Sequence, residues 1–210
     1  SKLIKEYGFT LGHQIMLGLP GDTFLKDIET TEKIISMEPD ICRIYPALVV
    51  KNTPMEIMYK QGIYSPYSLK EAVTICKIVY GMLIANGIKV IRVGLQPTEE
   101  INVGREVVAG PFHPAFRELV EGRIYNHILK KNIPLSYKGE ITVNINEKDL
   151  SKLYANKKEY FNLVKESFFY CPIKVVQDSS IGREALNIVG ENFNKYVQLD
   201  DYIMSNYKNF

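Results

Sequence analysis

Apolar runs alternate with segments of helical spacing along the first half of the chain. Three β-prone runs, residues 11–18, 40–50 and 88–96, contain few polar positions, as is typical of strands buried on both faces of a parallel sheet. The two longer segments between them place apolar residues three or four positions apart, which is the spacing of a helix with one buried face. This order of strands and helices predicts an α/β fold with a parallel sheet.

Capping residues indicate where these two helices begin and end. Asp22 or Thr23 can cap the first helix, because a short polar side chain can accept a hydrogen bond from a free N–H of the first turn. Ser68 and Glu71 have the spacing of a capping box, and Gly87 is placed to end the second helix.

The pattern changes after residue 96, where a loop rich in Gly and Pro is followed by mixed elements. We expect a helix over residues 115–131, strands over 139–146 and 168–178, a helix from 149 to about 166, and a last short strand or helix over 194–210. The predicted organisation is therefore a domain at residues 1–100 and a smaller α+β module at residues 101–210.

The composition is that of a globular protein with a sizeable core, with 46% hydrophobic and 24% charged residues. The net charge of +2 neither requires nor excludes a nucleic-acid partner. No run reaches the roughly 18 apolar residues of a membrane helix, and the first residues do not resemble a signal peptide. We expect a cytoplasmic protein without membrane contact.

Cys42, Cys76 and Cys171 each lie in an apolar run and show no CxxC or CxxxC spacing. The pattern favours buried structural thiols in a reducing compartment. A metal site assembled from these three distant segments is the alternative.

Ligands of parallel α/β units gather where the strands end. The first strand ends in Gly18-Leu19-Pro20-Gly21, and Arg43 and Arg92 lie on the next two strands. The glycine-rich turn lacks the GxGxxG spacing and the lysine of a phosphate-binding loop. Taken alone it is a tight turn between a strand and a helix, and a nucleotide-binding loop is a weaker hypothesis.

Three further segments point to a family. GHQIMLGLPGDT is followed by RIYPALVVKNTPMEIMYKQGIYSPYSLKEAV, IKVIRVGLQPTE and VAGPFHPAFRELVEGRIY. The first three of these segments resemble the second half of a radical S-adenosylmethionine (radical SAM) barrel, in the family of the elongator catalytic subunit and its bacterial Fe–S oxidoreductase relatives. The last resembles the segment where that family's C-terminal extension begins, and together the segments cover residues 12–125. The resemblance implies the C-terminal part of a partial (β/α)6 TIM-like barrel with parallel strands, followed by an α+β extension.

The resemblance also implies cofactors for the parent enzyme. A [4Fe–4S] cluster, held by three cysteines of an N-terminal loop, cleaves S-adenosylmethionine to a 5′-deoxyadenosyl radical. The backbone around Gln14, Met16 and Gly18 is implied to contact the adenine, and Arg43 the ribose or carboxylate. Tyr45 and Gln96 are implied to face the barrel interior.

His113 and Arg117 are the candidates for contact with the substrate. The alternatives are a histidine that only stiffens a proline-flanked loop and an arginine on a solvated face of mixed charge, because acidic residues interleave with the basic ones there.

The chain departs from the family in one respect, because it has no clustered cysteine motif. Thiolates are the expected cluster ligands, so we expect a fragment that is inactive alone, and we assign it no catalytic or metal-binding residue. We see no counterpart of the elongator acetyltransferase domain. The parent's partner is expected to be RNA, in particular tRNA, and the oligomeric state is open. The alternative function is a non-catalytic module that binds RNA or protein.

Overall fold

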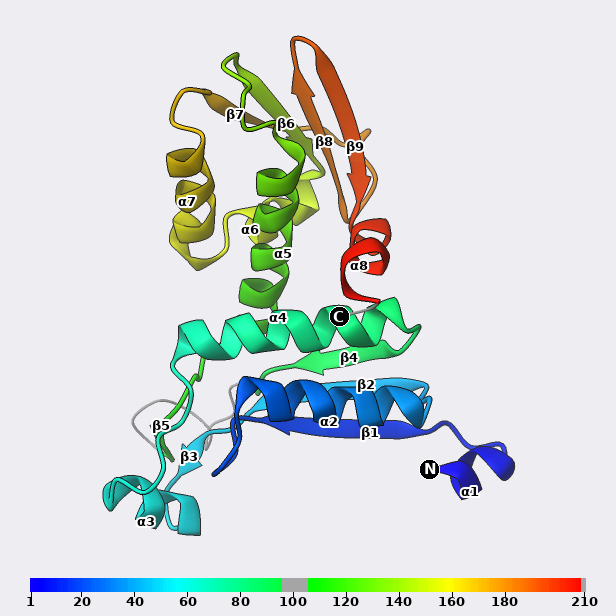
Figure 1. Cartoon of the computed structure of the whole chain (residues 1–210), viewed down its shortest axis with the longest axis vertical. Coiled ribbons are helices and arrows are strands. Elements are labelled where there is room, and N and C mark those ends of the chain that lie inside the picture. Colours follow the sequence, from blue (N-terminus) through cyan, green and yellow to red (C-terminus); the bar gives the residue numbers. More distant parts are fainter. Residues whose placement is uncertain (96–105, 209–210) are drawn as a thin grey trace. The chain divides into compact units, whose positions relative to one another are not determined.

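The computed structural model describes residues 1–95 and 106–208 (Figure 1). The chain divides into two compact units. Unit 1 comprises residues 1–117 together with the C-terminal end from Tyr207, and unit 2 comprises residues 118–206. The division at residue 100 that the sequence suggests stays a prediction.

The central feature of unit 1 is a parallel three-stranded sheet with the order β1-β2-β4. Its strands are β1 (Gly12–Leu17), β2 (Ile41–Pro46) and β4 (Lys89–Val93), and they are linked by α2 (Phe24–Ser36) and α4 (Leu69–Ala85). The two helices contact each other, and α4 contacts all three strands. The predicted parallel α/β arrangement is therefore confirmed.

Both helices begin as the sequence indicates. Thr23 accepts a hydrogen bond from the Lys26 N–H and is the N-cap of α2. Ser68 and Glu71 form the expected capping box at the start of α4. Gly87 follows the end of α4 with a φ of +76°, a conformation in which a residue without a Cβ avoids strain.

The expectation that these strands are buried on both faces is wrong. Ile15 and Leu17 of β1 are buried, but their neighbours Gln14 and Met16 are exposed. The same alternation occurs in β2, where Cys42 and Ile44 are buried and Arg43 is exposed. The helices cover one face of the sheet, and the other face carries exposed side chains.

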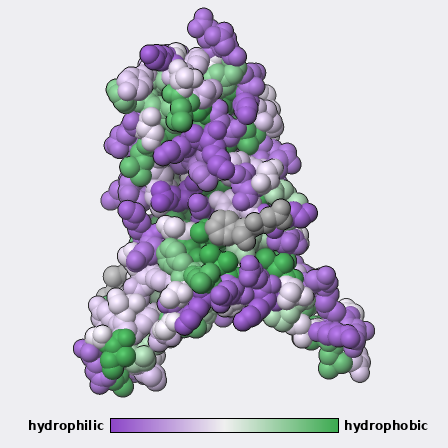
Figure 2. Space-filling model, in the orientation of Figure 1, coloured by the Kyte–Doolittle hydropathy of each residue, from purple (hydrophilic) through white to green (hydrophobic). Residues whose placement is uncertain are grey.

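The β-prone run 40–50 is not one strand. After β2 ends at Pro46, β3 (Val49–Val50) pairs antiparallel with β5 (Val107–Ala109), a strand in the segment expected to be loop. A short helix α3 (Pro54–Lys60) follows, and another, α1 (Lys2–Glu6), precedes β1. The exposed apolar side chains Ile57, Tyr59 and Ile63 belong to α3 and the turn after it, where Figure 2 shows a hydrophobic patch.

Unit 2 consists of a four-stranded sheet and helices packed on it. The sheet has the order β7-β6-β8-β9, with β6 and β7 parallel and the other pairs antiparallel. The strands are β6 (Ile141–Ile145), β7 (Ile173–Gln177), β8 (Ala185–Gly190) and β9 (Phe193–Gln198), preceded by α5 (Phe116–Asn132) and followed by α8 (Leu199–Tyr207). An α+β unit was expected here, although β8 was not.

The single helix expected from residue 149 to about 166 is wrong. The segment contains the short helices η1 (Glu147–Asp149), α6 (Leu150–Leu153) and η2 (Asn156–Lys158), then α7 (Glu159–Ser167). Asn156, Lys157 and Lys158 have φ values of +54°, +52° and +68°. Left-handed residues cannot continue a right-handed helix, so the chain turns between α6 and α7.

An ion-pair network around the buried Asp149 carboxylate ties η1 and α6 to the residues just before β8. The Asp149 carboxylate is fully buried and accepts hydrogen bonds from the Arg183 guanidinium at 2.9 Å and from the Glu184 N–H at 2.8 Å. The Lys152 ammonium lies 3.1 Å from carboxylate oxygens of Glu121 and Glu184. Burial works to raise the pKa of Asp149, but the hydrogen bonds outweigh it and hold that pKa below its usual value.

We predict that Asp149→Asn lowers the free energy of unfolding by about 3 kcal/mol at pH 7, because the substitution leaves charged partners of a buried carboxylate without their counter-charge. The loss should shrink as the pH falls below the carboxylate's ordinary range, where the wild-type group is also protonated. Denaturant unfolding measures both effects. Glu147→Gln, an exposed neighbour, is the control, and an equal loss in that variant would contradict the explanation.

Candidate functional site

The exposed face of the β1-β2-β4 sheet brings together most of the residues expected to bind a cofactor. Gln14 is the register partner of Arg43, and Met16 is the partner of Tyr45. Gln14, Met16 and Arg43 are exposed, whereas only 7% of the Tyr45 surface is accessible. An amide, a thioether and a guanidinium are therefore available on one surface, while Tyr45 contributes to the core.

Arg92 of β4, which the sequence places with Arg43 among the polar residues of the strands, joins this face. A register shift between Cys42 and Arg43 makes Arg92 the partner of Arg43 and leaves both Ile91 and Arg92 exposed. Neither guanidinium has an ion pair or hydrogen bond with another residue that the structure describes. Two neighbouring cations without a counter-charge repel each other, so the pair is suited to an anionic group.

A hollow of about 290 Å³ lies over this face and is lined by Gly12, His13, Gln14, Ile41, Arg43 and Ile91. Gly12 and Ile41 are the first residues of their strands. The hollow thus lies toward the amino ends of the strands, whereas the glycine-rich turn lies at the carboxyl end of β1. Gln14 and Arg43 line the hollow from the middle of their strands.

The turn Gly18-Leu19-Pro20-Gly21 is held by its own neighbours. Gly18 and Gly21 have φ values of +75° and +84°. The Asp22 carboxylate accepts a hydrogen bond from the Leu19 N–H at 2.8 Å, and the Lys26 ammonium donates to the Gly21 carbonyl at 2.6 Å. A carboxylate bound inside the turn would repel a phosphate, which argues against the nucleotide-binding hypothesis.

Side chains outside the turn also hold Gly18 in place. The Tyr64 hydroxyl donates to the Gly18 carbonyl at 2.6 Å, and the Gly18 N–H donates to the Asp27 carboxylate at 3.4 Å. The Tyr67 hydroxyl donates to the other oxygen of Asp27 at 2.9 Å. A Cβ on Gly18 would lie 2.5 Å from the Tyr67 ring, so only glycine fits.

These contacts around Gly18 were not predicted from the sequence. The signal available was an acidic residue, Asp27, within three positions of the apolar residues Phe24 and Ile28 of its helix. Asp27 is only 2% exposed, and burial raises its pKa to about 6, against the opposing effect of the hydrogen bonds from Tyr67 and Gly18. The same desolvation raises the pKa of the Tyr67 hydroxyl.

The two candidate substrate residues lie in different surroundings. His113 borders a crevice with Pro46, Leu48 and Gly94, near the carboxyl ends of β2 and β4, that leaves no room for a water molecule. Its Nδ1 accepts a hydrogen bond from the Ala115 N–H at 3.1 Å.

The Arg117 guanidinium instead donates to the Val90 carbonyl at 3.5 Å and lies 5.9 Å from the centre of the Tyr80 ring. Arg117 is thus engaged with β4 and α4. Gln96 lies outside the described residues.

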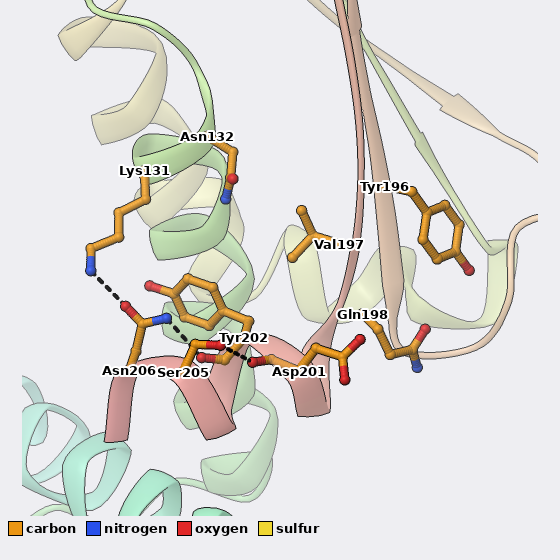
Figure 3. A pocket seen from close by; sticks show the side chains of 9 residues that line it. All are labelled: Lys131, Asn132, Tyr196, Val197, Gln198, Asp201, Tyr202, Ser205 and Asn206. Carbon is orange, nitrogen blue, oxygen red and sulfur yellow. Dashed lines mark hydrogen bonds between the residues drawn. The ribbon is translucent and has the colours of Figure 1, made fainter. Parts of the chain in front are cut away.

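Unit 2 contains a second hollow, of about 320 Å³, that the sequence did not indicate. It is bordered by the end of α5, by β9 and by α8 (Figure 3). The Lys131 ammonium donates to the Asn206 side chain at 2.6 Å across it. Its lining residues are Lys131, Asn132, Tyr196, Val197, Gln198, Asp201, Tyr202, Ser205 and Asn206.

The three cysteines are buried and free, as expected. Burial raises the pKa of the Cys42 thiol to about 11 and that of Cys76 as well. Among the described residues, no three side chains of His, Cys, Asp or Glu come together as metal ligands. No helix in this part of the chain is long and apolar enough to cross a membrane.

Comparison with known proteins supports the resemblance. Residues 39–126 match the Radical_SAM C-terminal domain. The chain is 33% identical over 78 residues to a tRNA uridine(34) acetyltransferase of Methanocaldococcus jannaschii, a match that covers 36% of this chain and 14% of the relative. It is 35% identical over 68 residues to the enzyme of the same name from Dehalococcoides mccartyi, covering 31% and 15%.

An uncharacterized protein of Methanocaldococcus jannaschii is 42% identical over 53 residues, which cover 25% of this chain and 16% of that protein. The chain thus spans a small part of the curated relatives it matches. These similarities confirm the resemblance to radical SAM proteins of the elongator-like kind, over part of the chain.

We predict that Gly18→Ala destabilises unit 1 by about 2 kcal/mol more than Gly21→Ala. Both substitutions place a side chain at positive φ, which costs about 1 kcal/mol. Only the first drives a methyl group into the Tyr67 ring, because a Cβ on Gly21 would have no neighbour within 4 Å in the described part of the chain. Equal losses in denaturant unfolding would show that Tyr67 does not confine the turn.

We predict that Asp27→Asn removes a pH-dependent loss of stability. The wild-type carboxyl has a folded-state pKa of about 6, raised above its ordinary value of 3.8, so its contribution to stability is present below pH 4 and lost as the pH rises through 6. The free energy of unfolding of the wild type relative to the variant should therefore fall between pH 4 and pH 7. A difference that is constant over this range would contradict the ionisation of a buried Asp27.

Proposed function

We propose that this chain carries the S-adenosylmethionine-binding face of a radical SAM enzyme, an Fe–S oxidoreductase that acts on tRNA. One observation supports the proposal above all. Gln14, Met16 and Arg43 lie exposed on one face of a parallel sheet. Beside them is a turn whose backbone at Gly18 is fixed by hydrogen bonds with Tyr64 and Asp27. The tRNA substrate is suggested by the names of the relatives, the tRNA uridine(34) acetyltransferases.

The residues of this face suit the cofactor's chemistry. S-adenosylmethionine combines a flat adenine, a ribose and a charged methionine part. The fixed backbone from Gln14 to Gly18 offers hydrogen bonds to the adenine, and the guanidinium of Arg43 suits a carboxylate because it can donate two parallel hydrogen bonds. Arg92, its register partner, would strengthen the attraction for that negative charge.

The described cysteines do not suit an iron–sulfur cluster. The side chains of Cys42 and Cys76 have no accessible surface, and burial raises the pKa of each thiol, whereas a cluster requires accessible thiolates. In the proposed enzyme the cluster ligands are therefore supplied by other residues, and this chain alone is catalytically incomplete.

The proposed architecture is a partial (β/α)6 barrel. β1 is an edge strand, with β2 as its neighbour among the described strands, and its free edge can accept a further strand. The exposed face would then become the inner wall of the barrel and form the cofactor side of the enzyme. His113 and Arg117 would lie on the substrate side.

The test is S-adenosylmethionine binding by the full-length protein that contains this chain. Arg43→Ala should weaken binding about tenfold or more, since hydrogen bonds between charged groups contribute about 1.5–3 kcal/mol, without changing the absorption spectrum of the cluster. Lys33→Ala, on an exposed position of α2, should leave the affinity unchanged. If Arg43→Ala bound S-adenosylmethionine with unaltered affinity, the proposal that the cofactor binds to this face would be contradicted.

A further inference from the structure

Unit 2 (residues 118–206) lies almost entirely beyond the region that matches the radical SAM family, so its role needs a separate explanation. Its helices α5, α6 and α7 lie on one side of the β7-β6-β8-β9 sheet (Figure 1). Val143, Ile145, Leu186 and Ile188, which alternate along the central strands, are fully buried. The side chains between them point to the opposite, helix-free face.

The helix-free face is polar, and none of the described strand residues on it is acidic. The strand register places on it residues from all four strands: Lys174, Val176, Thr142, Asn144, Ala185, Asn187, Val189, Asn194, Tyr196 and Gln198. This set contains four carboxamides, one ammonium group and one aromatic ring. Carboxamides both donate and accept hydrogen bonds, as the edges of nucleobases do.

Tyr196 provides an exposed ring on this face. Its accessible surface is 56% of the maximum, and Figure 3 shows it pointing away from Val197, α5 and α8. A Cβ on Gly182 would lie 2.9 Å from the Tyr196 hydroxyl, so the ring tip rests where residue 182 has no side chain. A ring held at its tip and exposed elsewhere can stack against a planar base at little cost in side-chain entropy.

The neighbouring carboxamides lie in line with this ring. Asn187 is the register partner of both Tyr196 and Asn144. The carboxamide oxygen of Asn187 is buried without a hydrogen-bond partner among the described residues. A buried acceptor without a partner costs stability.

These features favour a nucleic acid over a protein. The centre of a protein interface is typically apolar, and Val176 and Val189 are the only large aliphatic side chains of this face. Proteins that bind single-stranded RNA on a sheet typically stack bases on exposed aromatic rings and bind base edges with polar side chains. Lys174, exposed at the β7 edge, can contact a phosphate.

We propose that the helix-free face of the β7-β6-β8-β9 sheet binds a single-stranded segment of RNA, with a base stacked on Tyr196 and with Asn144 contacting a base edge. This inference rests on the proposed function for the choice of RNA. It makes unit 2 the part of the enzyme that holds an unpaired stretch of its RNA substrate.

The test is fluorescence anisotropy of the 210-residue chain with a labelled, unstructured RNA oligonucleotide at fixed salt concentration. Tyr196→Ala should weaken binding about tenfold, within the range expected for the loss of one stacked base, and Tyr196→Phe should restore it. The matched control is Tyr170→Ala, since Tyr170 is 58% exposed in the turn between α7 and β7, and it should bind as the wild type does.

Absence of RNA binding by the wild-type chain would overturn the inference. So would an equal loss in Tyr196→Ala and Tyr170→Ala, which would indicate non-specific contact. Because the experiment contains no S-adenosylmethionine, its failure is distinguishable from a failure of the cofactor-binding proposal, which is tested at Arg43.

Discussion

Burial of one face of the β1-β2-β4 sheet under α2 and α4 is the constraint on which the rest of unit 1 depends. The apolar side chains of Ile15, Leu17 and Ile44 are withdrawn from water on that side, which is the main favourable contribution to folding. Because strand side chains alternate between faces, the same packing fixes Gln14, Met16 and Arg43 on the opposite, exposed face. The location of the candidate site is therefore a consequence of the core.

The buried carboxyl group behind the glycine-rich turn lowers stability, and its presence there needs another explanation. A carboxyl group with its pKa raised to about 6 by burial, Asp27, destabilises the folded state at neutral pH. Its hydrogen bonds with Tyr67 and Gly18 fix the end of β1. Groups that are unfavourable for stability and precise in geometry are concentrated at functional sites, which agrees with a ligand-binding role for the turn.

The sequence was sufficient for features that depend on local spacing. It predicted the parallel α/β arrangement, a cap at Asp22 or Thr23, the capping box at Ser68 and the buried cysteines, because helix periodicity and capping are local properties. It could not reveal the register shift that exposes Arg92 or the left-handed residues 156–158. The contacts of Tyr64 and Tyr67 with Gly18 were also hidden, since they join distant segments. The exposure of one sheet face was missed because a short apolar run has the same appearance whether one or both faces are buried.

In the function we propose, the exposed face of the β1-β2-β4 sheet, bounded by the Gly18 turn, receives S-adenosylmethionine. The most direct test is a crystal structure of the full-length protein with S-adenosylhomocysteine, a stable analogue of the cofactor. We expect the adenine of the analogue to lie against the backbone between Gln14 and Gly18 and its carboxylate to lie within hydrogen-bonding distance of Arg43. An analogue bound elsewhere, or this face filled by protein side chains in that structure, would contradict it.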